Sequence, residues 1–466
     1  MSKTLFDLWN ENGDADAAAK AAPRPAKARA KKRSDPPRPS QSRPIRLLHT
    51  SDWHLGIQLD SVSREEEHKR FFDWLLATLE REQVDVLIVA GDIFNTAQPS
   101  AEALRDYYEF LSRAAALGAR RKQDLEVVVI GGNHDSAARL NAPRPLFDSL
   151  RVHVVGGMAS AHRRDSVLVP IGPPEHPELV VVAVPFVHEY HLGVRTTSRT
   201  PSQIAYDLNE SFEALYRDLA DEAEARWPGV PLVTTGHLTC GRRDQEGAEI
   251  HQVGTIGALD PGLFDPRYRY VALGHLHQCF SPDENRVWYS GSPIAMNLTE
   301  AHTPRSVLLV ELDGESTRVR GLPVPTWRPL IELRGSLEAV IEGLERLDWS
   351  TPFPPFVYPV VEVVDYEPRV DSLLLTACQT HAEAARPRII RIRQERTRSP
   401  ERAEADEAEQ TPPLRELGVE DVFERLFRQK KGRSPDLDTL IAFRSLLGEL
   451  EEEPACALRE GRDEAA

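Results

Sequence analysis

The sequence predicts a layered α/β core, followed by a smaller α/β unit and C-terminal helices. In the first half of the chain, continuous apolar runs rich in Val, Ile and Leu alternate with amphipathic segments, a pattern typical of strands covered on both faces. Strand-like runs dominate after that. Polar residues that can bind metal follow several of these runs, and strand-end loops are where α/β sheets build their sites.

Hydrophobic periodicity gives the order of elements in the core. Arg64–Gln83 carries Phe71, Leu75 and Leu79 along one stripe, which predicts an amphipathic helix, and Ala101–Leu117 has the same spacing. Strands are predicted at Ile45–Thr50, Val84–Ala90, Leu125–Ile130, Leu179–Pro185, Val230–Thr235, Tyr268–Leu273, Val287–Ser290 and Ser306–Leu312.

Proline-rich and charged segments predict the domain boundaries. Pro323–Pro325 ends the core, which is expected to span residues 45–325. Residues 396–413 are charged and contain proline, as a linker would, and they separate a small α/β unit from the C-terminal region 414–466 with its acidic tail. The small unit, residues 326–395, is predicted to contain helices at Ser336–Leu347 and Asp371–His381 and strands at Val357–Val364 and Arg388–Ile392, and the C-terminal region amphipathic helices at Val419–Phe427 and Asp436–Leu450.

The first 44 residues have a different composition from the rest. Residues 13–44 are rich in Ala, Pro, Lys and Arg and have almost no large apolar side chains. Such a segment cannot bury enough surface to offset its ordering entropy, so residues 1–44 are predicted to form a disordered basic arm. The apolar patch Leu5–Trp9 resembles the anchors that peptides insert into sliding clamps, although Ser2 stands where glutamine is usual. Docking of this patch on its own domain is the alternative.

Composition limits the classes of function. A net charge of −16 is a poor match for a protein that neutralises DNA over a broad surface by itself, so DNA binding would need local cation clusters, bound metals or a basic partner. The four cysteines lack C-x-x-C spacing, which predicts reduced thiols. No apolar run approaches the ~18 residues of a membrane span, and no signal peptide is apparent. We therefore expect a soluble, cytoplasmic protein.

Five short segments at predicted strand ends supply a metal-ligand set. In extended chain, residues two apart point to the same side, so Asp52 with His54, and His275 with His277, can each deliver two ligands to one place. Glycine precedes several ligands and lets the backbone turn sharply around small ions. The segments are Asp52-Trp53-His54, Gly91-Asp92, Gly132-Asn133-His134-Asp135, Gly236-His237 and Gly274-His275-Leu276-His277.

These ligand types predict a pair of divalent cations. Carboxylate, imidazole and amide groups suit Mn²⁺, Fe²⁺ or Zn²⁺. Asp52, Asp92 and a bridging hydroxide would cancel three of the four positive charges, which leaves a site that attracts phosphate. Two ions ~3.5–4 Å apart polarise phosphorus and activate a bridging water for in-line attack on a phosphate ester. His134 would sit beside the site, where it could protonate the leaving oxygen.

The remaining histidines lack this context. We expect them to be structural or solvated, with His68 on the polar surface of its helix. They are His49, His68, His153, His162, His176, His188, His191, His251, His302 and His381.

With their flanking residues, the ligand segments resemble the calcineurin-like metallophosphoesterases. Within them the similarity is greatest to the bacterial SbcD family, which is related to the Mre-type repair nucleases, and it runs from about Ile45 to Leu447. Trp53, the Gly-Ser-Pro run and the two-part C-terminal extension point to this nuclease branch. The matching stretches are Leu48–Gly56, Ile88–Phe94, Gly132–Ser136, Thr235–Thr239, Ala272–His277 and Tyr289–Pro293.

The resemblance implies a fold and a ligand assignment. The fold would be a four-layer core of two mixed sheets flanked by helices. One ion would take Asp52, His54 and His277, and the other Asn133, His237 and His275, with Asp92 bridging and His134 as the catalytic histidine. The metal would be Mn²⁺.

The resemblance also implies an activity and partners. The expected enzyme trims 3′ ends of duplex DNA and nicks single strands or hairpins in DNA repair and recombination, close to the nucleoid. Residues 326–395 would cap the DNA. The C-terminal helices would bind an SbcC-like coiled-coil ABC-type ATPase, with two copies of each protein in the assembly. The chain has no Gly-Lys dipeptide and hence no P-loop, so any ATP dependence must come from that partner.

Some alternatives stay open. The same core could serve a phosphatase or cyclic nucleotide phosphodiesterase, or a DNA-end tethering scaffold with little catalysis. The C-terminal helices could pack on their own capping domain. Asn95 stands where relatives carry aspartate or histidine, and asparagine cannot donate a proton as histidinium would, so the balance of exonuclease and endonuclease activity is not fixed by the sequence.

Overall fold

A computed structural model describes residues 43–121, 125–158, 167–194, 201–241 and 259–396, together with Phe423, Phe427, Thr439 and Phe443. The chain divides into two units, Met1–Pro44 and Ile45–Ala466. The predicted clamp anchor Leu5–Trp9, nearly all of the basic arm, the linker after Arg396 and the acidic tail lie outside the described residues. In the part of the chain that is described, no helix is long and apolar enough to cross a membrane.

The first sheet of the core has six strands and is mainly parallel. β1, β4, β5 and β6 run parallel to one another, β12 pairs antiparallel with β1, and β13 pairs antiparallel with β12. The strand order is β13 (Ser316–Pro323), β12 (Ser306–Asp313), β1 (Ile45–Thr50), β4 (Val86–Ala90), β5 (Glu126–Ile130) and β6 (Val152–Val155).

The second sheet has five strands. β8 to β11 are parallel, and β7 pairs antiparallel with β8 at the edge. The strand order is β11 (Val287–Tyr289), β10 (Tyr268–Gly274), β9 (Leu232–His237), β8 (Leu179–Val182) and β7 (Leu168–Ile171).

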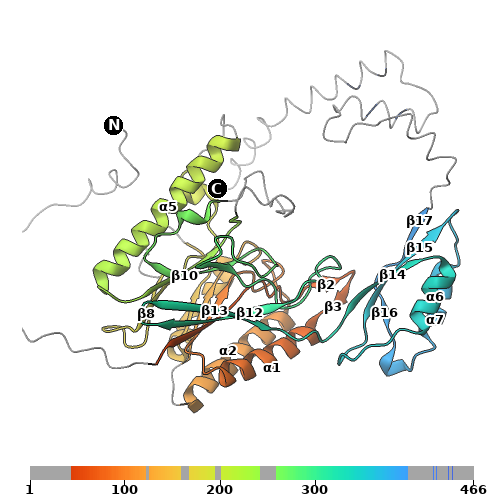
Figure 1. The fold of residues 1–466 in the computed structure, drawn as a ribbon, viewed down its shortest axis with the longest axis horizontal. Coiled ribbons are helices and arrows are strands. Elements are labelled where there is room, and N and C mark those ends of the chain that lie inside the picture. Colours follow the sequence, from red (N-terminus) through yellow and green to blue (C-terminus); the bar gives the residue numbers. More distant parts are fainter. Residues whose placement is uncertain are drawn as a thin grey trace, which may run out of the picture. The chain divides into compact units, whose positions relative to one another are not determined.

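The two sheets and their helices form four layers (Figure 1). Successive strand residues point to opposite faces, so Ile88 joins the cluster between the sheets, whereas Leu87 and Val89 pack beneath the helices α1 (Glu65–Arg81) and α2 (Ala101–Arg121). The long helix α5 (Pro201–Arg226) covers the outer face of the second sheet. The predicted four-layer core is therefore confirmed. Short elements complete it, at β2 (Gln58–Leu59), β3 (Val62–Ser63), α3 (Ala137–Asn141) and α4 (Arg144–Phe147).

Residues after Val324 build a small α/β unit with its own apolar cluster. Its sheet has β15 (Phe356–Val363) at the centre, parallel to all three partners, and the helices α6 (Leu337–Glu345) and α7 (Val370–Cys378) contribute to its cluster. The three partner strands are β14 (Leu330–Gly335), β16 (Arg388–Ile389) and β17 (Arg393–Arg396).

A buried charge network joins this unit to helix α1. The Arg328 guanidinium donates to Glu67 at 3.1 Å and lies 4.4 Å from the ring centroid of Phe356. Arg64 donates to the same Glu67 carboxylate at 2.7 Å. Because Glu67 is almost fully buried, removing either cation would leave part of a buried charge uncompensated.

Most predicted elements are confirmed within a few residues, and the differences have clear causes. The predicted strand Arg388–Ile392 is wrong in extent, since β16 ends at Ile389 and a separate strand, β17, begins at Arg393. Helix α5 was not predicted from the sequence, although it is 26 residues long. Strand β13 was not predicted either, because among its residues only Leu322 is fully buried and the apolar alternation that marks a strand is weak.

Candidate metal centre

All seven predicted ligands converge where five parallel strands end. β1, β4, β5, β9 and β10 each deliver one ligand segment at the carboxyl edge of their sheet, as expected for α/β folds. Backbone hydrogen bonds tie two of these segments together, because Asp52 N donates to Gly91 O and His54 N donates to Asp92 O, both at 3.0 Å. The side chains form three groups of three, and within each group the atoms that could bind a metal lie within 4.8 Å of one another.

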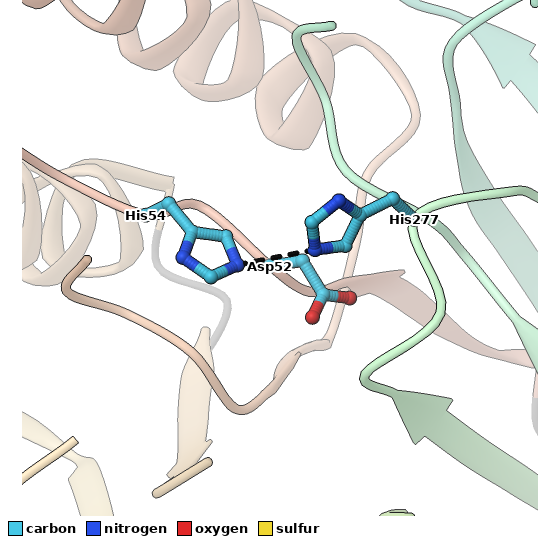
Figure 2. Close-up of side chains that lie close together, drawn as sticks. All are labelled: Asp52, His54 and His277. Atoms are coloured by element: carbon cyan, nitrogen blue, oxygen red, sulfur yellow. Dashed lines mark hydrogen bonds between the residues drawn. The ribbon is translucent and has the colours of Figure 1, made fainter. Parts of the chain in front are cut away.

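The first triplet is Asp52, His54 and His277 (Figure 2). The two imidazoles point toward one another, with 3.2 Å between their Nε2 atoms. The Asp52 carboxylate is fully buried and is oriented by the hydroxyl of Ser51 at 2.5 Å and by the backbone N–H of His275 at 3.0 Å. Two imidazole nitrogens and a carboxylate facing one point form a suitable site for a divalent cation.

The second triplet is Asp92, His237 and His275, and Asn133 completes it. The Asn133 side-chain oxygen lies 3.0 Å from His237 Nε2 and 3.1 Å from His275 Nδ1. The other ring nitrogen of His237 donates to the carbonyl of Ala90 at 2.9 Å, which leaves Nε2 free to face the centre.

Asp92 belongs to the second triplet and also reaches His54 of the first. Its Oδ2 is 3.6 Å from His54 Nε2 and 3.3 Å from His237 Nε2. Its Oδ1 accepts the backbone N–H of His134 at 2.9 Å. A single buried carboxylate that reaches both ligand sets has the position that a bridging ligand needs.

The pKa values of the ligands follow from burial and from Asp92. Burial lowers the pKa of His54 to about 3 and that of His275 to about 4, so their lone pairs are available at neutral pH. Burial also opposes charge on His237, but the adjacent Asp92 carboxylate outweighs it and raises the pKa of His237 to about 9. Burial raises the pKa of the Asp52 carboxyl. A positive charge placed at this point would favour the anionic carboxylates and neutral imidazoles together, so the donor set fits divalent cations.

His134 lies at the open side of the centre. It groups with His54 and Asp92, and its ring is 5.0 Å from that of His54. His134 Nδ1 lies 2.9 Å from the backbone carbonyl of Asn95. Because a carbonyl oxygen only accepts, Nδ1 carries the proton in this contact, which leaves the lone pair of the neutral ring on Nε2. The contact uses the backbone of Asn95, so it does not depend on which side chain stands at that position.

The backbone at the ligands is not extended, contrary to the expectation for the paired ligands. Asp52, His54, Asp92 and His275 have φ values of 52°, 47°, 50° and 98°, in or near the left-handed region that non-glycine residues rarely adopt. Residues held there are typical of functional sites, and the surrounding structure must enforce them. Asp52 and His54 do reach one triplet through these turns, whereas His275 and His277 belong to different triplets, so the second pair does not deliver two ligands to one place.

Two glycines allow the loops to approach closely. A Cβ at Gly132 would lie 2.2 Å from the carboxylate of Asp92, and one at Gly274 would lie 1.9 Å from the carbonyl of Ala90. Any side chain at either position would push the ligand loops apart, which agrees with the role predicted for the glycines that precede the ligands.

His68 is the clearest correction to the expectations from sequence. It was expected on a helix surface, but it is buried, and its Nε2 donates to the carbonyl of Trp53 at 2.7 Å. Trp53 lies between Asp52 and His54, so His68 holds the ligand loop in place. Periodicity gives a reason, since His68 precedes the buried residues Phe71 and Leu75 by three and seven positions on the same helix face.

Two carboxylates that support the centre were not predicted from the sequence. Asp135 accepts backbone N–H groups from Gly132, Ile93 and Phe94 and thereby joins two ligand loops. Glu300 accepts from His277 Nδ1 at 3.0 Å. Asp135 belongs to one of the predicted ligand segments, whereas no local pattern marks Glu300, 23 residues beyond its partner.

The comparisons with known proteins agree with this geometry. A family described as calcineurin-like phosphoesterase matches residues 45–279, and one described as type 5 capsule protein repressor C-terminal domain matches residues 326–431. The SbcD protein of the SbcCD nuclease from Rhodobacter capsulatus is 34% identical over 372 residues, which cover 74% of this chain and 90% of that protein. The corresponding SbcD protein from Escherichia coli K12 is 32% identical over 390 residues, covering 82% and 92%.

The chain belongs to the SbcD family of calcineurin-like phosphoesterases. The family predicted from the sequence is thus confirmed, and the chain is a hydrolase of the phosphodiesterase type and the subunit of a nuclease. A dimetal phosphatase from Danio rerio also matches by structure, with 11% identity and a TM-score of 0.33 over 61% of this chain and 99% of that one.

Proposed function

We propose that this nuclease is an Mn²⁺-dependent 3′–5′ exonuclease on duplex DNA and an endonuclease on single strands and hairpins. The observation that carries the proposal is the convergence of seven carboxylate, imidazole and amide ligands from five strand ends on one point. Oxygen and imidazole donors without thiolate suit manganese among the divalent ions. The relatives' name, which makes them part of the SbcCD nuclease, supports DNA as the substrate.

Each ligand has a defined task in this proposal. Asp52, His54 and His277 hold one divalent cation, and Asn133, His237 and His275 hold the other, with Asp92 shared between them. A divalent pair held there would supply Lewis-acid chemistry, polarising a phosphodiester and making water more acidic for attack on phosphorus. The buried loops keep the donors oriented and exclude water from their far sides.

His134 is the proposed catalytic histidine. The hydrogen bond to the Asn95 carbonyl keeps one proton of His134 on Nδ1. A second proton, carried on Nε2, can then be delivered to the leaving oxygen of the cleaved ester. His134 is exposed, unlike the ligands around it, so a large substrate can reach it.

Residues 326–395 are proposed to cap the DNA, and residues 396–413 to link this unit to ATPase-binding helices within 414–466. The salt bridges between Arg328 and helix α1 support a fixed attachment of the cap to the core. Near the C-terminus, Phe423 and Phe443 are both helical, and their rings stack with centroids 3.9 Å apart. This contact supports a paired-helix element as the docking site for an SbcC-like coiled-coil ATPase, in an assembly with two copies of each protein.

Digestion of end-labelled duplex and hairpin DNA with Mn²⁺, with and without the coiled-coil ATPase, tests the proposal. We expect shortening from 3′ ends and hairpin opening that EDTA abolishes, and ATP dependence only with the partner present. Hydrolysis of small phosphodiesters with no cleavage of DNA in the complex would instead favour a small-substrate phosphoesterase. Binding of DNA ends without cleavage of either substrate would favour a tethering scaffold.

A further inference from the structure

Glu300 lies behind His277, on the side of the imidazole that faces away from the other ligands. Glu300 Oε1 is 3.0 Å from His277 Nδ1, while His277 Nε2 is 3.2 Å from His54 Nε2. The carboxylate accepts a hydrogen bond from the Nδ1–H group of His277. The lone pair of the imidazole is therefore on Nε2, the nitrogen that faces the centre. Glu300 thus determines which nitrogen of His277 can bind a cation.

Several groups hold the Glu300 carboxylate in place. The backbone N–H of Met296 donates to Oε2 at 3.0 Å, and the side-chain amide of Asn297 donates to Oε1 at 2.8 Å. Arg305 lies 3.3 Å from Oε2 and also donates to the backbone carbonyl of His277 at 2.7 Å. The carboxylate side chain is only 16% exposed, so its orientation toward His277 is fixed by partners on several sides.

The opposite half of the centre has a different kind of support. His237 donates its outer N–H to the carbonyl of Ala90, which is a neutral acceptor. Asn133 is itself a neutral ligand. The half with His277 therefore combines the ligand carboxylate of Asp52 with the charge of Glu300 directly behind an imidazole, whereas the half with His237 relies on the shared Asp92 for its negative charge.

We propose that Glu300 is a positioning residue that fixes His277 as an Nε2 ligand and makes the Asp52/His54/His277 position bind Mn²⁺ more tightly than the Asn133/His237/His275 position. This rests on the ligand assignment in the proposed function. A charged acceptor strengthens an imidazole as a donor more than a neutral one does, and changes to such outer partners typically cost about 10–100-fold in metal affinity.

Titration of the metal-free protein with Mn²⁺ alone tests this without reference to catalysis. The electron paramagnetic resonance signal of free aqueous Mn²⁺ gives the number and affinity of bound ions. We expect two ions of unequal affinity in the native protein. Glu300→Gln keeps an acceptor but removes the charge, so it should weaken the tighter class by about 10-fold, and Glu300→Ala by about 100-fold.

Ligand backgrounds identify the affected position. In Asn133→Ala, which impairs the other position, adding Glu300→Gln should still weaken the remaining ion by about 10-fold. In His277→Ala, adding Glu300→Gln should change nothing further, because Glu300 acts through His277. An equal loss in both backgrounds would overturn the proposal.

A loop control separates positioning from structure. Thr299→Ala removes a hydrogen bond to Asn297 within the same loop, and that bond involves neither Glu300 nor His277. If Thr299→Ala weakens Mn²⁺ binding as much as Glu300→Gln does, or if Glu300→Gln lowers the melting temperature of the metal-free protein in parallel with affinity, Glu300 is only a loop anchor. Fewer than two ions in the native protein would refute the proposed function itself, whereas two ions unaffected by Glu300→Gln would refute only this inference.

Discussion

The two halves of the metal centre use similar ligands but are supported in different ways. Around Asp52, His54 and His277 the support comes from side chains, since Ser51 orients Asp52 and Glu300 orients His277. Around Asn133, His237 and His275 the clearest outer contact is a backbone carbonyl, that of Ala90.

The difference shows which parts of the site can vary independently of the fold. A backbone acceptor such as Ala90 O is present whatever the side chain, because it belongs to strand β4. A side-chain support such as Glu300 can be changed without altering a strand. Substitution of a supporting side chain should therefore change metal binding more readily in the half with Asp52 than in the half with His237. Substitutions in and around the centre test this contrast.

Asp92→Ala should abolish the contrast, because Asp92 reaches ligands of both halves. Loss of the shared carboxylate should remove several kcal/mol of transition-state stabilisation, which corresponds to a fall in DNA cleavage of about 10³-fold or more. Bound Mn²⁺ should fall from two ions per chain. Asp73→Ala, at an exposed position on helix α1, is the control and should match the native protein. Unchanged manganese stoichiometry in Asp92→Ala would contradict a bridging role.

His134→Asn should leave both halves intact and remove the proton donor beside them. Asparagine can donate a hydrogen bond but cannot deliver a proton, so the cleavage rate should fall by about 10²–10⁴-fold while two Mn²⁺ ions still bind. Single-turnover cleavage together with metal titration measures both effects. The exposed loop residue His176 supplies the control as His176→Asn. Full cleavage by His134→Asn would remove this residue from the mechanism.

His68→Gln should change how the free energy of unfolding depends on pH. His68 supports the loop that carries Asp52 and His54. Burial lowers the pKa of His68 to about 4, whereas an unfolded histidine has a pKa of about 6.5. As the pH falls below 6.5, the unfolded chain therefore takes up a proton that the folded chain does not, and the folded state loses stability. Between pH 6.5 and 5 this amounts to about 2 kcal/mol, at about 1.4 kcal/mol per pH unit.

Glutamine can still donate to the Trp53 carbonyl but does not titrate. Between pH 6.5 and pH 5, the free energy of unfolding of His68→Gln should therefore fall by about 2 kcal/mol less than that of the native protein. Urea unfolding of the metal-free proteins at pH 6.5 and pH 5 measures the difference. Equal losses in the two proteins would mean that the pKa of His68 is the same in the folded and unfolded states.

Asn95→Asp should have the smallest effect. The hydrogen bond between His134 and Asn95 uses the backbone carbonyl of Asn95, and that carbonyl persists in the variant. Cleavage of duplex ends and of hairpins should each change by less than about 10-fold, within about 1.4 kcal/mol. A large change in the ratio of the two activities would instead assign the side chain at this position a direct role in substrate selection.

Local sequence patterns were sufficient to predict most of the core. The strands before Asp52, Asp92 and Asn133 are short runs rich in Val, Leu and Ile, and most of their positions are buried in the structure, as such runs predict. The pattern failed for the long helix α5, and it misplaced the strand near Arg388. In these segments packing against the rest of the fold, and not local periodicity, decides the conformation.

The family and the candidate ligands could be identified without a structure, because each ligand is adjacent to a strand whose apolar pattern is local. How these residues face one another depended on the folded chain. Folding placed Asp52 and His275 in or near left-handed conformations, brought Glu300 behind His277 and buried His68 under Trp53. Such contacts join residues that are distant in the chain or depend on how a loop turns, and no local spacing encodes either of these.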